Sequence, residues 1–268
     1  MPRLTTASNP AIEIMDSAEA ANTGTTGCDV SGVGVNKTDL SRSRTSWRIV
    51  LAGISGVLLA LPILNSYLYL LSWFALVPLL LAVRDLSLRT SYLLSAFSGL
   101  ILYLCSTYWV LPFIVNMKGY SAGVAVLISG LFWLYSAHVI VIIMLFWRIL
   151  SKSLQWGRLI LFPALFVMVF SIFPNVFPMQ LGGGQSHFLL ATQATDIAGL
   201  YGLDFVVALS NICLYELLSP YLEKNKQVKR DVRAKRLGPM PYVLSGVFIS
   251  VWFVYGYCSL SLWEQQQS

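Results

Sequence analysis

The sequence predicts an all-α, polytopic transmembrane helical bundle of about seven spans. Apolar residues make up 56% of the chain and charged residues only 11%, whereas soluble domains carry roughly 25% charged residues. The mean hydropathy is +0.69, and apolar runs of about 20 residues, long enough to cross a bilayer, recur along the chain. These runs lack the alternation of barrel strands, and a helix satisfies its own backbone hydrogen bonds in lipid, so helices are the expected spanning element.

Residues 1–46 are predicted to be a disordered cytoplasmic tail. They are rich in Ser, Thr, Asn and Gly and have no apolar periodicity. A secretory signal has an apolar core directly after a short basic start, whereas here the first such core follows Arg48. We therefore expect no cleaved leader.

Residues 47–262 are predicted to form the transmembrane domain. The first two apolar stretches are separated by a few residues around Pro62 and Asn65, which indicates a tight helical hairpin. The third and fourth exceed about 20 residues, so we expect them to tilt, to protrude or to be broken near Pro112 and Gly130. The seven stretches are 47–64, 66–83, 91–117, 121–147, 158–173, 199–219 and 240–260.

The basic residues predict the orientation. With seven spans, every lysine and arginine except Lys118 falls on one side of the membrane. The positive-inside rule places that side in the cytoplasm, so the N-terminus is expected inside and the C-terminus outside. The net charge of +6 therefore faces anionic lipid. We expect no nucleic-acid partner, because the cations are dispersed over loops beside the membrane.

The cysteines and His138 are expected to be structural. None of the four cysteines forms a CxxC or Cys/His ligand spacing, which predicts no metal site. No cysteine in a span has a Lys or His at helical spacing to activate it, so a catalytic cysteine is not expected. His138 is interpreted as hydrogen bonded to another helix, with a proton-relay role as the alternative.

The segment FPNVFPMQLGGGQSHF, residues 173–188, carries no charge. We expect it to fold back on the membrane face, because so apolar a loop would be unfavourable in water. Its prolines would set the turns, and its glycines would allow close backbone approach. Two interpretations stay open: a structural re-entrant loop, or a contact surface for lipid or acyl chains that includes Gln185 and His187.

Two carboxylates lie in or beside the sixth apolar stretch. Asp196 is predicted to cap the helix that begins near Gly199. Asp204 lies about 7.5 Å beyond Gly199 along the helix axis. An isolated charge is unfavourable at that depth, so Asp204 must be neutral, hydrated or paired. The two acids lie about 80° apart around the helix and form no general acid/base dyad. Gly199 and Gly202 are predicted to allow close helix packing, and for Asp204 a structural and a functional role both stay open.

Five pieces of the sequence together resemble the membrane domain of apolipoprotein N-acyltransferases. They are SWFALVPLLLAV (72–83), STYWVLPFIVNMKGYS (106–121), PALFVMVF (163–170), FPMQLGGGQS (177–186) and LLATQATDIAGLYGLDFVVALSN (189–211). The resemblance runs from Trp47 to Glu264. The matching residues are Phe74, Ala75, Leu76, Pro78, Leu79, Leu80, Tyr108, Trp109, Phe177, Pro178, Gln193, Asp196, Gly199, Gly202, Phe205 and Asn211.

The resemblance implies a bacterial inner-membrane protein that acts in lipoprotein biosynthesis. Family members transfer an acyl chain from a phospholipid to the N-terminal cysteine of a lipoprotein, without a cofactor. Their Glu, Lys and Cys triad belongs to a periplasmic nitrilase-like domain. The chain stops at about the point where that domain would begin, so we expect no catalytic residues here and no activity of this chain alone. The implied partners are phospholipid, a lipoprotein substrate and a separate nitrilase-like chain.

The sequence departs from the family pattern at two places. Residues 166–179, FVMVFSIFPNVFPM, lack the Glu and Arg that often precede the family's Phe-Pro-Trp loop, and Met179 replaces the tryptophan. Asp204 stands where the family tends to have a small hydroxyl residue. The lipid- or substrate-facing candidates are Tyr108, Trp109, Phe177 and Pro178, from the resemblance, and Gln185 and His187, from the uncharged loop.

Two other classes of function stay open. A small transporter could use Asp204, Glu216 and His138 as an intramembrane polar path. A membrane scaffold could anchor a partner enzyme. A proton- or ion-coupled flux that is lost in Asp204→Asn would favour the transporter.

Overall fold

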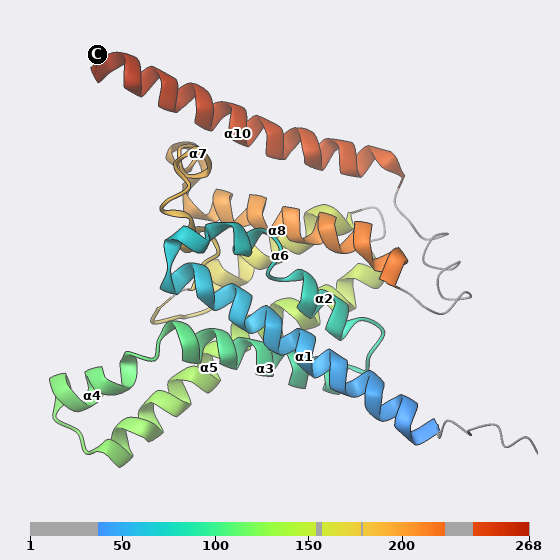
Figure 1. Ribbon diagram of the computed structural model, residues 1–268, viewed down its shortest axis with the longest axis vertical. Coiled ribbons are helices and arrows are strands. Elements are labelled where there is room, and N and C mark those ends of the chain that lie inside the picture. The colour runs from blue at the N-terminus through green and yellow to red at the C-terminus, as the bar shows by residue number, and fades with distance from the viewer. Residues whose placement is uncertain (1–36, 154–156, 178, 223–237, 268) are drawn as a thin grey trace, which may run out of the picture. The chain divides into compact units, whose positions relative to one another are not determined.

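The computed structural model describes residues 37–153, 157–177, 179–222 and 238–267, which contain helices and no strand (Figure 1). The predicted tail, apart from its last residues, lies outside the described residues. Helix α1 begins at Lys37, so its first turns fall within the segment assigned to the tail. The elements are α1 (Lys37–Leu64), η1 (Ser66–Trp73), α2 (Val77–Val83), α3 (Leu88–Ser106), α4 (Val110–Lys118), α5 (Ala122–Ser153), α6 (Arg158–Ile172), η2 (Gly182–Gln185), α7 (Leu189–Thr192), α8 (Thr195–Leu222) and α10 (Pro239–Gln267).

The helical membrane bundle is confirmed. In the described part of the chain, six helical segments are long and apolar enough to cross a membrane: Ser46–Leu64, Ser66–Val83, Leu88–Ser106, Ala122–Ser153, Thr195–Leu222 and Pro239–Gln266. The fifth predicted span is α6, an apolar helix of 15 residues. It is shorter than the roughly 20 residues of a typical span.

The first two spans form the predicted hairpin, but the second is not a regular α-helix. Helix α1 ends at Leu64, and the Asn65 side chain accepts a hydrogen bond from the Tyr67 backbone N–H at the start of η1. After the 3-10 helix η1, the backbone leaves helical geometry at Phe74 before α2 begins. The middle of this apolar segment therefore has backbone groups without regular helical partners.

The third predicted span is broken and the fourth is not. The break falls between α3 and α4, at residues 107–109, just before the predicted position at Pro112. Helix α4 ends at Lys118, and the next residue, Gly119, has a φ of 69°, the left-handed conformation that favours glycine. Helix α5 runs for 32 residues without interruption at Gly130, so its length, about 48 Å, must be accommodated by tilt or protrusion.

Helix α8 lies at the centre of the packing. It contacts η1, α2, α6, η2, α7 and α10, and Leu203, Val206, Val207 and Ala208 are fully buried. Helices α3 and α5 pack through Gly99, where a Cβ atom would lie 2.6 Å from the Ala137 carbonyl oxygen. Small residues allow such close approach in membrane bundles.

Arginines gather at one end of the bundle, which we call the basic end. The Arg48 guanidinium donates to the Arg84 carbonyl at 2.8 Å, and that of Arg84 donates to the Ser219 carbonyl at 3.1 Å. Arg158 lies 3.9 Å from Glu216. The first two contacts satisfy carbonyl groups near the ends of α2 and α8, as expected of side chains near a lipid headgroup layer.

Candidate functional site

The end of the bundle opposite the basic end carries the loop helix η2, and we call it the loop end. Gln185 and Asp204 lie there, whereas Asn211 lies further along α8 toward the basic end. Asn211, on α8, is fully buried and fixes the irregular part of the second span. Its amide oxygen accepts from the Leu76 N–H at 2.8 Å, and its amide nitrogen donates to the carbonyls of Ser72 and Val207 at 2.8 and 2.9 Å. Asn211 therefore serves backbone groups on both sides of the break between η1 and α2.

Two hydroxyl groups complete this arrangement. Ser55 on α1 donates to the Ala75 carbonyl at 2.6 Å, and Ser210 on α8 donates to the Trp73 carbonyl at 3.2 Å. Non-helical backbone at membrane depth is stable only where protein groups satisfy it. Hydrogen bonds from α1 and α8 therefore stabilise the non-helical backbone of residues 72–76.

Gln185 connects the glycine-rich loop to the same span. Its side chain is fully buried. Its amide oxygen accepts from the Trp73 indole N–H at 3.1 Å, and its amide nitrogen donates to the Tyr69 carbonyl at 3.0 Å. The loop thus folds back on the bundle, and its contact with the membrane face stays a prediction.

Asp204 contacts the first residue of η2 (Gly182–Gln185), the short helix in the glycine-rich loop. One carboxylate oxygen accepts from the Gly182 N–H at 2.7 Å, and Asp204 is fully buried. Its second oxygen is buried without a hydrogen-bond partner among the described residues. Asp204 thus accepts a hydrogen bond from a backbone N–H group at the start of η2.

We expect Asp204→Asn to change the free energy of unfolding by less than about 1 kcal/mol, because the amide oxygen keeps the bond to Gly182. Asp204→Ala should lower it by about 1–3 kcal/mol, because the Gly182 N–H is left buried and unpaired. Denaturant titration in mixed micelles measures both. Equal losses in the two variants would contradict the role of this hydrogen bond.

An aromatic cluster covers the loop. His187 stacks on Tyr67 at a centroid distance of 4.2 Å. Phe188 stacks on Tyr69 at 4.7 Å and also contacts Trp73 and Phe253. His187 and its neighbour therefore fasten the loop to η1, and Phe253 brings α10 to the same cluster.

Three other candidates lie around the start of α4. Phe177 packs edge-to-face on Trp109 at 5.0 Å, beside the small core of Val110, Ile114 and Ala125. Tyr108 is 62% exposed. Pro178 lies outside the described residues.

The residues that lead into α8 contact α10. Asp196 accepts a hydrogen bond from the Tyr255 hydroxyl at 2.9 Å, and Gln193 is 3.4 Å from the Ser259 hydroxyl. Gly199 has a φ of 64°, which interrupts the helix after its first turn. The contact that the structure gives Asp196 is thus with α10, and its capping role stays a prediction.

Gly202 lies where Trp252 approaches α8. A Cβ atom there would lie 3.0 Å from the Trp252 ring. The Trp252 indole N–H donates to the Ala191 carbonyl at 2.8 Å. The predicted close packing at this glycine therefore involves an aromatic ring of α10.

The groups of the transporter alternative have separate partners. His138 accepts or donates a hydrogen bond with the Tyr92 hydroxyl at 2.9 Å, which is the predicted contact with another helix. Glu216 pairs with Arg158 at the basic end, whereas Asp204 binds the loop. These contacts give the transporter no additional support.

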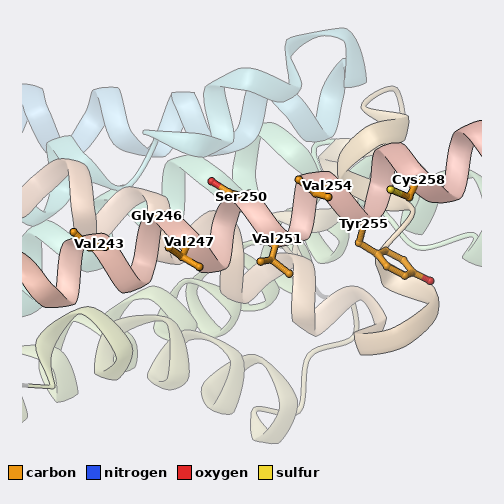
Figure 2. A pocket seen from close by; sticks show the side chains of 8 residues that line it. All are labelled: Val243, Gly246, Val247, Ser250, Val251, Val254, Tyr255 and Cys258. Atoms are coloured by element: carbon orange, nitrogen blue, oxygen red, sulfur yellow. The ribbon is translucent and has the colours of Figure 1, made fainter.

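A shallow groove of about 700 Å³ runs along one face of α10. Figure 2 shows that its labelled side chains all come from this helix. None of the predicted site residues lines it. The lining residues are Val243, Gly246, Val247, Ser250, Val251, Val254, Tyr255 and Cys258.

Residues 55–213 match the family model described as the apolipoprotein N-acyltransferase N-terminal domain. This segment contains the broken second span, the glycine-rich loop and the three buried residues that join them, Gln185, Asp204 and Asn211. The chain belongs to the apolipoprotein N-acyltransferase family. The match ends before α10, so Tyr255 and the groove lie outside it.

The chain is also similar to curated apolipoprotein N-acyltransferases. A protein of that name from Geobacter metallireducens is 29% identical over 237 residues, which are 80% of this chain and 40% of the relative. Apolipoprotein N-acyltransferase 2 from Leptospira interrogans is 26% identical over 161 residues, 56% of this chain and 27% of the relative. The chain thus spans less than half the length of these N-acyltransferases.

Four residues that contribute to the candidate site were not predicted from the sequence. Ser55, Ser72, Tyr69 and Trp73 all contribute to the contacts with Asn211, Gln185 or the irregular backbone. Ser72 and Trp73 fall within the family piece that begins at Ser72, whereas Ser55 and Tyr69 lie outside all five pieces.

Proposed function

We propose that this chain is the membrane half of an apolipoprotein N-acyltransferase. It would act in the transfer of an acyl chain from a phospholipid to the N-terminal cysteine of a lipoprotein. The match to the family's N-terminal domain over residues 55–213 carries this proposal. The loop end would be the side that meets lipid and lipoprotein substrates.

We propose further that the nucleophile comes from a domain with the Glu, Lys and Cys triad, in the same polypeptide or in a partner chain. The buried polar groups are already hydrogen bonded within the protein: Asn211 to backbone of the second span, Gln185 to the Tyr69 carbonyl and the Trp73 indole N–H, and Asp204 to the Gly182 N–H. Acyl transfer through a thioester needs an activated thiol. The three free cysteines of the described residues lie in the apolar helices α3, α8 and α10.

The proposed location is the bacterial inner membrane, with the N-terminus in the cytoplasm and the C-terminus in the periplasm. The basic end supports this orientation because Arg48, Arg84 and Arg158 lie together there, and cationic side chains favour the cytoplasmic face. The loop end would then face the periplasm.

The test is acyl transfer to a diacylated lipopeptide in phospholipid vesicles that contain this chain. We expect no product from the 268-residue chain alone and product when a nitrilase-like domain is supplied. The matched control supplies the same domain with its nucleophilic cysteine replaced by alanine. Turnover by the chain alone, or by the control, would contradict the assignment of the triad to the second domain.

A further inference from the structure

The hairpin formed by α4 and the first part of α5, residues 108–128, extends past the neighbouring helix α3. Helices α3 and α5 lie side by side, and a hydrogen bond at each end of α3 shows which residues of α5 lie beside that end. The Arg148 guanidinium donates to the Ser87 carbonyl at 3.1 Å, at the start of α3. The Trp133 indole N–H donates to Thr107 at 3.1 Å, at the end of α3. The residues of α5 before Trp133 therefore continue beyond α3, together with α4 (Figure 1).

The length of α5 gives the depth of the hairpin tip. About 26 residues separate Arg148 from Ala122, or about 39 Å of helix. Membrane helices tilt by about 20° on average and by up to about 40°, which reduces this rise to about 37 or 30 Å. The hydrocarbon layer is about 30 Å thick, and each headgroup layer adds about 5–7 Å. With Arg148 at one boundary, the tip therefore falls at the opposite boundary or within its headgroup layer.

The surface of the hairpin fits this depth. Met117 is 72% exposed, Leu127 63% and Phe113 42%, and so much apolar surface is unfavourable in water. Tyr120 at the tip is 51% exposed, and tyrosine is enriched at the membrane interface. Lys118 ends α4 and has no ion-pair partner among the described residues. Residues 108–128 contain no Asp or Glu, so an anion that neutralises Lys118 has to come from outside the hairpin, for example from a lipid phosphate.

We infer that the tip of the α4–α5 hairpin is a lipid-contact surface in the headgroup layer at the loop end. Lys118 lies against phosphate groups, and Met117 and Phe113 lie against the outermost acyl carbons. The position of the hairpin relative to α3 carries this inference, which does not depend on the proposed catalytic partner.

Spin labels measure the depth directly. The four cysteines are replaced by alanine, and single cysteines are introduced at Met117 and, as a control, at Gly183, the exposed residue of the loop helix η2. The labelled protein is reconstituted into vesicles of phosphatidylcholine and phosphatidylglycerol. We expect the label at 117 to collide with oxygen several-fold more often than with water-soluble nickel chelate, and the label at 183 to show more contact with the chelate. Chelate contact at 117 equal to that at 183 would overturn the inference, because the hairpin would then stand in water or await a protein partner.

The role of Lys118 is tested in the same system. Lys118→Glu should move the label at 117 toward water, because the carboxylate is repelled by lipid phosphates, whereas Lys118→Arg should leave the depth unchanged. Met117 is highly exposed, so labelling there does not disturb the core. The same depth in both variants would overturn the phosphate contact.

Discussion

Asn211→Leu is expected to lower the free energy of unfolding by about 2–6 kcal/mol. Leucine has a similar volume but leaves the Leu76 N–H and the Ser72 carbonyl without partners, and each unpaired buried group costs about 1–3 kcal/mol. These groups lie at the break of an apolar span, where water is not available to replace Asn211. Reversible unfolding in mixed micelles, followed by circular dichroism, measures the loss.

The matched control is the neighbouring residue. Ser210→Ala removes one hydrogen bond, of 3.2 Å, to the Trp73 carbonyl and should cost about 0.5–1.5 kcal/mol. Asn211→Asp keeps the acceptor for Leu76 but places either a buried charge or a single O–H donor against the Ser72 and Val207 carbonyls, so we expect it to destabilise the protein more than Ser210→Ala. An Asn211→Leu protein as stable as Ser210→Ala would show that the break does not depend on Asn211.

Gly184→Ala is expected to destabilise the protein by about 2–3 kcal/mol through overpacking of the loop against α1. A Cβ atom at this position would lie 2.7 Å from the Pro62 side chain and 3.0 Å from the Pro62 carbonyl oxygen. Pro62 lies in the last turn of α1, so neither its ring nor its carbonyl group can move away freely. Thermal unfolding in detergent measures the change.

Gly183 provides the control for this substitution. It lies one residue earlier in the same loop helix, and a Cβ atom there meets nothing within 4 Å. Gly183→Ala should therefore leave the midpoint of unfolding within error of the wild type. Equal effects of the two substitutions would exclude close packing against Pro62 as the cause.

The helical bundle could be predicted from hydropathy because the spacing of apolar runs reports directly on transfer into lipid. Backbone geometry within a run could not. The segment 66–83 is apolar throughout, yet it contains a 3-10 helix, a break and a short α-helix. The break is stabilised by Asn211 and Ser55, which lie far from it in the sequence. Hydropathy does not record such long-range hydrogen bonds.

In the candidate site, too, some features could be predicted from the sequence and others could not. Asp204, Gln185 and the triple glycine were singled out by charge, polarity and backbone freedom, and the structure brings all three to the loop end. Their mutual arrangement was not predicted. The same holds for the contact of Asp196 with Tyr255, since α10 follows in the sequence about 60 residues later and its packing has no local signal.

Cysteine labelling in cells tests most directly the claim that the loop end faces the periplasm and the basic end the cytoplasm. In a cysteine-free background, one variant carries Gly183→Cys at the loop end and the other Lys152→Cys, an exposed position at the end of α5 nearest Arg148. With a maleimide that cannot cross the bilayer, we predict labelling of Gly183→Cys in intact spheroplasts and of Lys152→Cys only after lysis. Labelling of Lys152→Cys in intact spheroplasts, with Gly183→Cys protected until lysis, would contradict the account.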